Sequence, residues 1–151
     1  MRAMRPMRLC DAHTHFFSRN FFDLLAAQAA RARGVAAPSI LDEAVRKAGI
    51  ELPAASPLRH AEKWTAELDR HGVHRAVAFA SLPGEAPAVA EACAAARGRL
   101  IPFVLGDPTT PEGMDAGRRA LLEQGFRGIL LFPALHRFDP ADRSLDPLYR
   151  V

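Results

Sequence analysis

Two histidines two positions apart, His13 and His15, are the residues in this sequence best suited to chemistry. On a β-strand, side chains at i and i+2 point to the same face, because successive Cβ atoms alternate between the faces. Neutral imidazole is the commonest metal-binding side chain. The spacing therefore predicts two neighbouring bonds to one divalent metal ion. The alternative interpretation is two half-buried histidines at the end of a strand.

Two residues beside the pair are expected to have indirect roles. Asp11 shares the face of the histidines but lies one pleat deeper, so we expect it to support the metal site or the strand rather than bind the ion. Cys10 has the opposite parity and is predicted to be a small core residue that faces away. Cys10 and Cys93 are the only cysteines. Two isolated cysteines form no disulfide framework and are typical of a reducing cytoplasm.

Four short apolar runs are predicted to be the strands that position these residues: 7–11, 76–82, 100–105 and 128–132. The histidines follow the first run, where a strand would open into a loop. The other three runs are nearly continuous rather than alternating, which is typical of parallel strands covered on both faces.

Helical patterns lie between these runs. Ser56 is expected to cap a helix that has Pro57 at its first position and ends at Gly72. Trp64 lies on the apolar stripe of this helix and is interpreted as a core residue. Further helices are expected over residues 85–97, from Thr110 and Pro111 to Gly125, and from Asp146 and Pro147 onward.

The alternation of strands and helices predicts an α/β fold with a parallel sheet. The later repeats come about every 25–30 residues, which is the pitch of a (β/α)₈ barrel of the TIM type, of roughly 250 residues. Four βα units are half of such a barrel, and the sequence ends at Val151, a few residues into the fourth helix. We therefore expect residues 1–151 to be the truncated N-terminal half of one barrel domain.

Residues 17–55 are predicted to be a long, largely irregular insertion after the first strand. Loops of about 40 residues are usually lids, binding loops or disordered segments. Short helices are suggested near residue 24 and over 41–47. An apolar insertion here would cover the mouth of a barrel, where active sites of this fold lie. The phenylalanines that open the segment could equally anchor it to the core: Phe16, Phe17, Phe21 and Phe22.

The sequence resembles the amidohydrolase superfamily. Its opening, Asp-Ala-His-Thr-His-Phe at 11–16, looks like that of the amidohydrolase-related (type 2) branch, which includes aminocarboxymuconate-semialdehyde decarboxylase, related decarboxylases and lactone hydrolases. Three later stretches agree in family order: 71–77 before strand two, 125–129 before strand four, and 145–149 at the fourth helix. The opening motif is shared with other metal-dependent barrels, whereas the stretch from strand four to the fourth helix is more particular.

The resemblance implies a zinc-type site at the carboxyl end of a barrel, with His13 and His15 as the two ligands from strand one. In the family, a His after strand five and an Asp after strand eight complete the metal site, and a His after strand six assists catalysis. These strands, and with them the catalytic residues, are expected beyond Val151. Relatives often carry a Lys and then a His on strand four, where this sequence has Leu130 and Phe132. One metal ion is therefore expected rather than a pair bridged by a carbamylated lysine.

The resemblance leaves two reactions open. One is metal-dependent hydrolysis of a small organic substrate, and the other is non-oxidative decarboxylation on the same scaffold. We expect residues 1–151 alone to be inactive. A third alternative is a non-catalytic half-barrel that self-associates through open sheet edges and exposed apolar faces.

Three further residues are candidates for substrate binding because of their location. Asp107 follows the third predicted strand, and His136 and Arg137 follow the fourth, on the catalytic side of a barrel. Arg137 could hold a carboxylate. His60 is expected to face solvent from the first long helix. His71 and His74 flank the glycine that ends this helix, where a cationic histidine is favourable.

Composition narrows the set of partners. A net charge of +3, with 49% hydrophobic and 25% charged residues, is ordinary for a globular protein. No basic stripe with interleaved aromatic residues points to nucleic acid. No run approaches the roughly 20 apolar residues of a membrane helix, and the amino terminus lacks the apolar core of a signal peptide. We expect a cytoplasmic protein with a small-molecule substrate, no nucleic-acid or membrane partner, and a possible homo-oligomer.

Overall fold

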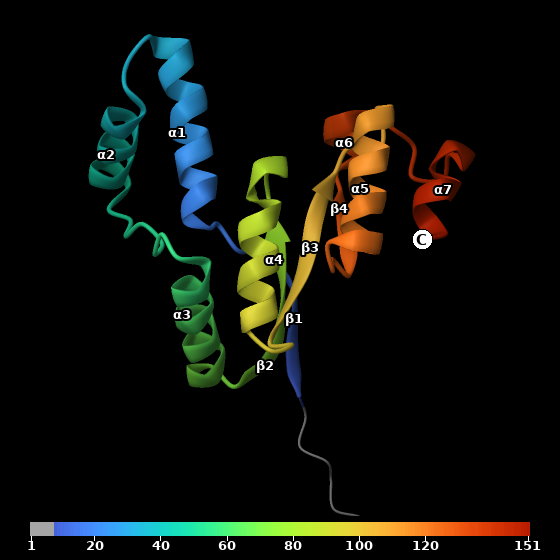
Figure 1. Cartoon of the computed structure of the whole chain (residues 1–151), viewed down its shortest axis with the longest axis horizontal. Helices are drawn as coiled ribbons and strands as arrows, with labels where there is room; N and C mark the ends of the chain where they lie inside the picture. The colour runs from blue at the N-terminus through green and yellow to red at the C-terminus, as the bar shows by residue number, and fades with distance from the viewer. Residues whose placement is uncertain (1–7) are drawn as a thin grey trace, which may run out of the picture.

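A parallel four-stranded sheet forms the centre of the molecule, shown in Figure 1 as a computed structural model that describes residues 8–151. The strands lie in chain order, β1-β2-β3-β4, and every neighbouring pair is parallel. The sheet is curled into a half-barrel, which agrees with the predicted run of βα units. The strand bounds are β1 Leu9–His15, β2 Val73–Ala80, β3 Leu100–Gly106 and β4 Gly128–Leu131.

The strand bounds lie within two residues of the predicted runs except at the start of β2 and the end of β1. β2 begins at Val73 because Val73 and Arg75 pair with Leu9 and Cys10, which a search for continuous apolar residues does not detect. β1 extends through His15, so both histidines lie within the strand rather than in the loop after it. Met7, the predicted first residue of this strand, lies outside the described residues.

The helices between the strands begin at the predicted caps. The Ser56 hydroxyl accepts a hydrogen bond from the main-chain N–H of Arg59 at the start of α3. Thr110 does the same for Gly113 at the start of α5. A single 3₁₀ turn, η1, precedes α4. The bounds are α3 Pro57–Arg70, η1 Pro83–Glu85, α4 Ala86–Ala95, α5 Pro111–Glu123, α6 Pro133–His136, η2 Arg143–Leu145 and α7 Asp146–Tyr149.

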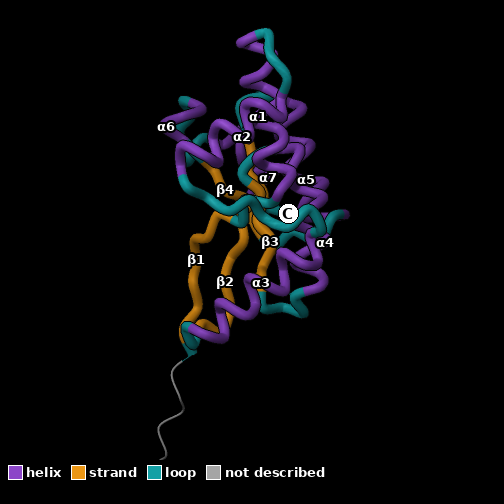
Figure 2. The backbone as a smooth tube through the Cα atoms, turned by 90° about the vertical axis from the view of Figure 1, so that its left-hand side faces the viewer, coloured by secondary structure: helices purple, strands orange, loops and turns teal. Residues whose placement is uncertain are grey.

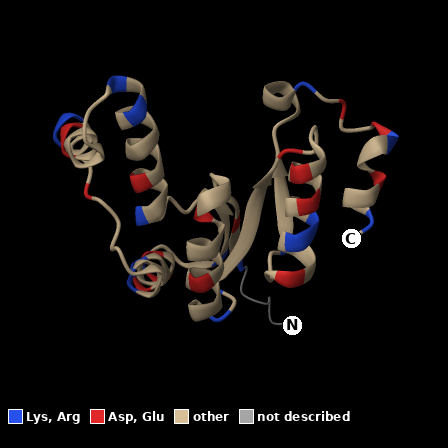
Figure 3. Cartoon of the chain, turned by 45° about the horizontal axis from the view of Figure 1, so that its top comes forward, with Lys and Arg blue, Asp and Glu red and all other residues tan. Residues whose placement is uncertain are grey.

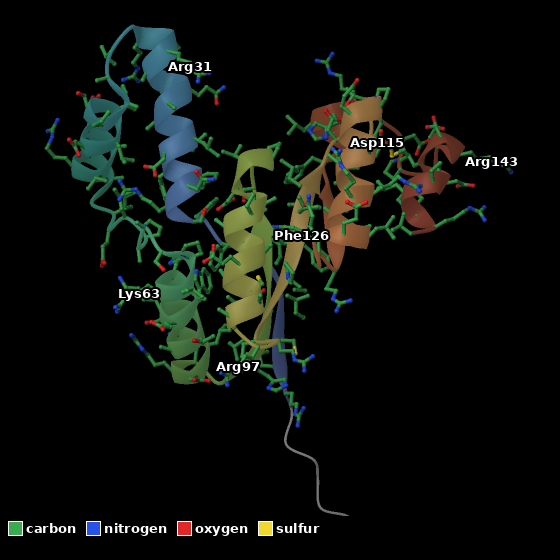
Figure 4. The ribbon with its side chains drawn as sticks, in the orientation of Figure 1. Arg31, Lys63, Arg97, Asp115, Phe126 and Arg143 are labelled. Carbon is green, nitrogen blue, oxygen red and sulfur yellow. The ribbon has the colours of Figure 1, made fainter. Side chains whose placement is uncertain are left out.

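The hydrophobic core lies between the sheet and helices α3, α4 and α5, which gather on one side of the strands (Figure 2). Small side chains on β2, such as Ala78 and Ala80, are fully buried against this layer. Trp64 packs against the same cluster, as predicted. Phe126 is buried in it, whereas Arg31 and Arg143 lie at the periphery (Figure 4). Most of the buried apolar contacts of the sheet are therefore made on the side that faces these helices.

The other side of the sheet carries larger apolar side chains that are only partly covered. Phe79, Phe103 and Gly128 are paired along one row of the register, and His15 continues the row on β1. Phe79 is buried, but Phe103 is half-buried. A Cβ on residue 128 would collide with the Phe103 ring, so the glycine provides the space for that ring. Within residues 8–151, the predicted cover on both faces is found on one face only.

The predicted irregular insertion contains two well-formed helices, α1 Arg19–Arg33 and α2 Ala37–Ala48. They project beyond the carboxyl ends of the strands (Figure 1). Ser18 caps α1 through its side chain, and Gly34 ends it with a positive φ of 65°. The prediction of short helices in a largely irregular segment was wrong in extent. Alanine and arginine favour long helices even where the apolar pattern is weak.

Cys10 is exposed, which corrects the prediction of a core residue. β1 is an edge strand that packs on β2, and no helix in the described residues covers the face that Cys10 shares. Cys93 of α4 is buried, and burial raises the pKa of its thiol to about 12. No helix within residues 8–151 has the length and apolar character needed to cross a bilayer.

Candidate metal centre

The two histidines of β1 bring their ring nitrogens together. The Nε2 atoms of His13 and His15 are 3.3 Å apart, and the rings meet edge to face with centroids 5.1 Å apart. Tetrahedral zinc holds imidazole nitrogens about 2.0–2.1 Å away, which places two such nitrogens about 3.3–3.4 Å from each other. The separation of the two nitrogens therefore fits a shared ion.

A hydrogen bond engages one of the two ring nitrogens of His15. Its Nδ1 lies 2.8 Å from the Ser81 hydroxyl, in the loop that follows β2. When Nδ1 carries the proton and donates to Ser81, the Nε2 lone pair is free and points toward His13. A metal-binding histidine commonly uses its other nitrogen in this way, which fixes both tautomer and ring orientation.

Aromatic rings limit the movement of both imidazoles. His15 stacks on Phe17 with an interplanar angle of 12° and centroids 5.2 Å apart. His13 lies against Phe79, with centroids 4.6 Å apart. His13 is nevertheless exposed, whereas His15 is half-buried.

Asp11 interacts with the main chain rather than with an imidazole. Its Oδ1 accepts a hydrogen bond of 2.9 Å from the main-chain N–H of His13. The pairing of β1 with β2 is irregular between Asp11 and Thr14, so this bond lies where the strand departs from a regular ladder. It therefore fixes the backbone from which His13 projects.

No third ligand joins the pair in the part of the chain that the structure describes. Among residues 8–151, no group of three or more His, Cys, Asp or Glu side chains is arranged to hold a metal ion. The pair alone offers two of the three or so protein ligands that a catalytic zinc uses.

The candidates after β3 and β4 form a second, looser group at the carboxyl ends of the strands. His136 is 17% exposed, and its Nδ1 lies 3.7 Å from Asp107 Oδ1. That nitrogen is buried and makes no hydrogen bond. Bonds from the hydroxyl and the main-chain N–H of Thr109 hold the pKa of Asp107 below its usual range. Arg137 is exposed and ends α6 with a positive φ of 56°. The structure thus pairs His136 with Asp107 and leaves Arg137 apart.

Sequence reasoning missed Glu85, which is completely buried beneath the site. Its Oε1 accepts a hydrogen bond of 2.6 Å from the main-chain N–H of Ser18, and its Oε2 accepts one of 2.7 Å from that of Ser81. Glu85 therefore joins the start of α1 to the residue that contacts His15. The sequence signal is weak: Glu85 is a charged residue directly before the mostly apolar helix α4.

His60 is half-buried, which corrects the expectation that it faces solvent. Its Nε2 lies 3.1 Å from the Phe16 carbonyl oxygen and 3.2 Å from Trp64 Nε1. The Phe16 ring packs against it with centroids 4.5 Å apart. Burial lowers the pKa of His60. This histidine fastens the end of β1 to α3. His71, just after the end of α3, is exposed beside Glu67.

Basic and acidic residues are interspersed along the helices (Figure 3). The chain matches the family model described as Amidohydrolase over residues 10–151. No curated protein and no solved structure matches it significantly. The matched region begins one residue before Asp11 and contains both histidines and most of β1, with all of the other three strands. A match over this share of the sequence establishes that the chain belongs to the amidohydrolase family.

Proposed function

We propose that the chain supplies the first two ligands, His13 and His15, of a metal-dependent hydrolase acting on a small organic substrate. The observation that carries the proposal is the convergence of the two Nε2 atoms at 3.3 Å. Membership of the amidohydrolase family, whose members generally bind divalent metals, supports it. Zinc is the ion best suited to a neutral histidine pair in such a site.

The residues of the chain have separate tasks in this proposal. His13 and His15 hold the ion, Ser81 orients His15, and Asp11 fixes the backbone of His13. When bound, such an ion lowers the pKa of a water molecule toward ~7 and polarises the oxygen of the substrate. Phe17 packs on the ring of His15, and Phe79 packs on the ring of His13, so each imidazole has one aromatic neighbour that restricts its rotation.

We assign substrate binding to the group at the ends of β3 and β4. The Nδ1 atom of His136 lies 3.7 Å from Oδ1 of Asp107 in this group. The guanidinium of the adjacent Arg137 can bind a carboxylate through two parallel hydrogen bonds. A small substrate that carries a carboxylate group suits this set of residues.

The helical pair α1–α2 is proposed as the cover of the site. It projects at the carboxyl ends of the strands, the end at which the two histidines lie (Figure 1). Exposed apolar side chains such as Leu24 and Leu25 on α1 give it a surface that can close over a substrate.

Zinc binding to the 151-residue chain tests the proposal directly. We expect calorimetry or a histidine NMR titration to show one zinc site, which His13→Ala and His15→Ala each weaken strongly. The matched control is His71→Ala, which removes an exposed histidine and should leave the affinity unchanged. Zinc affinity that is the same in the double variant H13A/H15A as in the wild type would overturn the proposal. In a form of the protein that turns over substrate, release of CO₂ would indicate a decarboxylase. Uptake of water into the product would indicate a hydrolase.

One observation favours a second role, self-association. In the described residues β1 and β4 are unpaired at their outer edges, and the face that carries Phe103 and Leu105 is only half-buried. Open edges and apolar faces promote pairing between chains. A dimer whose population rises with concentration, in a chain that does not bind zinc, would support this role over the enzymatic one.

A further inference from the structure

Outside the histidine pair His13 and His15, the most unusual feature of the structure is the completely buried carboxylate of Glu85. Its side chain is 0% exposed, and both carboxyl oxygens accept hydrogen bonds from main-chain N–H groups. Buried charged side chains are rare unless they are fully bonded, because moving them out of water is costly. A residue that only began α4 would not need this environment, since a helix N-terminus is usually capped at the surface by a small polar side chain.

Glu85 lies between two segments that are far apart in the sequence. One is Ser18, which caps α1, and the other is Ser81, which follows β2. The main chain of Ser81 is held by Glu85, while its hydroxyl contacts Nδ1 of His15 at 2.8 Å. The three residues Glu85, Ser81 and His15 therefore form a continuous chain of contacts, through the main chain and then the hydroxyl of Ser81, that ends at the candidate metal ligand.

We propose that Ser81, held in place by Glu85, is a positioning residue that fixes His15 in the Nδ1–H tautomer and so presents the Nε2 lone pair to the metal. This inference rests on the proposed metal site. It goes further by assigning to two residues outside the His-x-His motif the control of which nitrogen binds.

The arrangement has a consequence for the metal-free chain. If His15 donates through Nδ1, its Nε2 is an acceptor, and the 3.3 Å contact with His13 is a hydrogen bond that His13 Nε2–H donates. The two histidines should then have opposite tautomers before metal binds, with the proton on Nδ1 in His15 and on Nε2 in His13. Binding of the ion requires only His13 to move its proton.

The same anchor fastens the insertion to the strand-two loop. The Asn20 side-chain amide donates to the Gly84 carbonyl oxygen. A Cβ on residue 84 would lie 2.9 Å from Leu24 Cδ1, so glycine lets α1 approach the 3₁₀ turn closely. The base of α1 and the partner of His15 are therefore held by one structural unit, the turn Pro83–Glu85.

The test is a pair of nearly isosteric substitutions, Ser81→Thr and Ser81→Val, which differ in the hydroxyl alone. Long-range ¹H–¹⁵N spectra of the ¹⁵N-histidine-labelled, metal-free chain report the tautomer of each histidine. We expect His15 to be Nδ1–H in the wild type and in Ser81→Thr, and to shift toward Nε2–H in Ser81→Val. Zinc affinity should fall by about 10-fold in Ser81→Val, at the lower end of the usual effect of removing such a partner. Ser81→Thr should retain it.

Glu85→Gln tests whether Glu85 holds Ser81 in place. A glutamine keeps one acceptor but turns its NH₂ group toward the other main-chain N–H, so one of the two bonds is lost. We expect an intermediate loss of the Nδ1–H tautomer of His15, while the exposed Ser39→Ala on α2 leaves it unchanged. An Nε2–H tautomer of His15 in the wild type, or identical tautomers and zinc affinities in Ser81→Thr and Ser81→Val, would overturn the inference. Failure of the wild type to bind zinc would instead contradict the metal site, because the metal-free spectra test Ser81 independently.

Discussion

The two ends of the sheet hold their histidines in different ways. At the β1 end, His13 and His15 contact each other, Ser81 and two phenylalanine rings, and a buried glutamate supports the arrangement. At the β4 end, His136 has a buried Nδ1 without a hydrogen bond and a carboxylate 3.7 Å away. The first group is held by several mutual contacts. In the second group Thr109 holds Asp107, but Nδ1 of His136 makes no hydrogen bond, so the β4 end is the more adjustable of the two.

The largest expected effect is on metal affinity at the β1 end. We predict that His13→Ala weakens zinc binding by more than the roughly 10–100-fold that the loss of a supporting partner costs, because it removes a ligand outright. His136→Ala should leave zinc affinity unchanged, since its ring belongs to the other group. Calorimetric titration of both variants measures the contrast. Equal losses in the two variants would mean that the two ends form one site.

The second prediction concerns the support beneath β1. Glu85→Ala removes both acceptors and leaves two main-chain N–H groups unbonded, at a cost of about 1–3 kcal/mol for each buried group. We therefore expect a loss of about 3 kcal/mol in the free energy of unfolding, measured by urea denaturation. Glu91→Ala, which removes an exposed glutamate on α4, is the matched control and should change stability little. Similar stabilities in the two variants would show that the buried bonds contribute nothing.

The third prediction uses His60, which holds the end of β1. Burial keeps the pKa of folded His60 below its ordinary value of 6.5. The unfolded chain therefore takes up a proton at a higher pH than the folded chain does, and stability is lost as the pH falls through the ordinary histidine range. We expect the free energy of unfolding to decline from about pH 7.5 to about pH 5.5.

The control for this pH dependence is His60→Gln, in which the decline should be smaller. The pKa of His74 is also lowered, chiefly by desolvation, so a part of the decline should remain in this variant. Parallel pH profiles for the wild type and His60→Gln would exclude His60 as a source of the effect.

The smallest effect is expected at the β4 end. Asp107→Asn removes the counter-ion of His136 but keeps an oxygen that can accept from Thr109, so the free energy of unfolding should change by less than about 1 kcal/mol. Asp115→Asn on the exposed side of α5 is the matched control (Figure 4). A loss for Asp107→Asn as large as that for Glu85→Ala would remove the distinction between a positioned and an adjustable end.

Features that depend on neighbours in the sequence were predictable. The helix starts at Ser56 and Thr110 follow from side chains that bond N–H groups three residues away. The continuous apolar runs located β2, β3 and β4, because parallel strands beneath helices need apolar residues on both faces. The same spacing argument placed His13 and His15 on one face, and their Nε2 atoms do converge.

Features that depend on contacts between residues far apart in the sequence could not be predicted. Ser18 lies 67 residues from Glu85, and Phe16 lies 44 residues from His60, so no local pattern shows that either ionisable side chain is buried. The exposure of Cys10 depends on β1 being at the edge of the sheet, which strand parity does not report. Predictions about the missing ligands, the lid and the substrate stay predictions.

The row of rings across the open face of the sheet sets a limit on how the sequence can vary. His13 touches Phe79, Phe79 meets Phe103 edge to face with centroids 5.6 Å apart, and Phe103 occupies the space left by Gly128. A methyl group added at residue 128 would displace the Phe103 ring, and that ring is already packed against its neighbour. Gly128 on the last strand and the histidine pair on the first are therefore joined by one continuous row of ring contacts, which spans the whole width of the sheet.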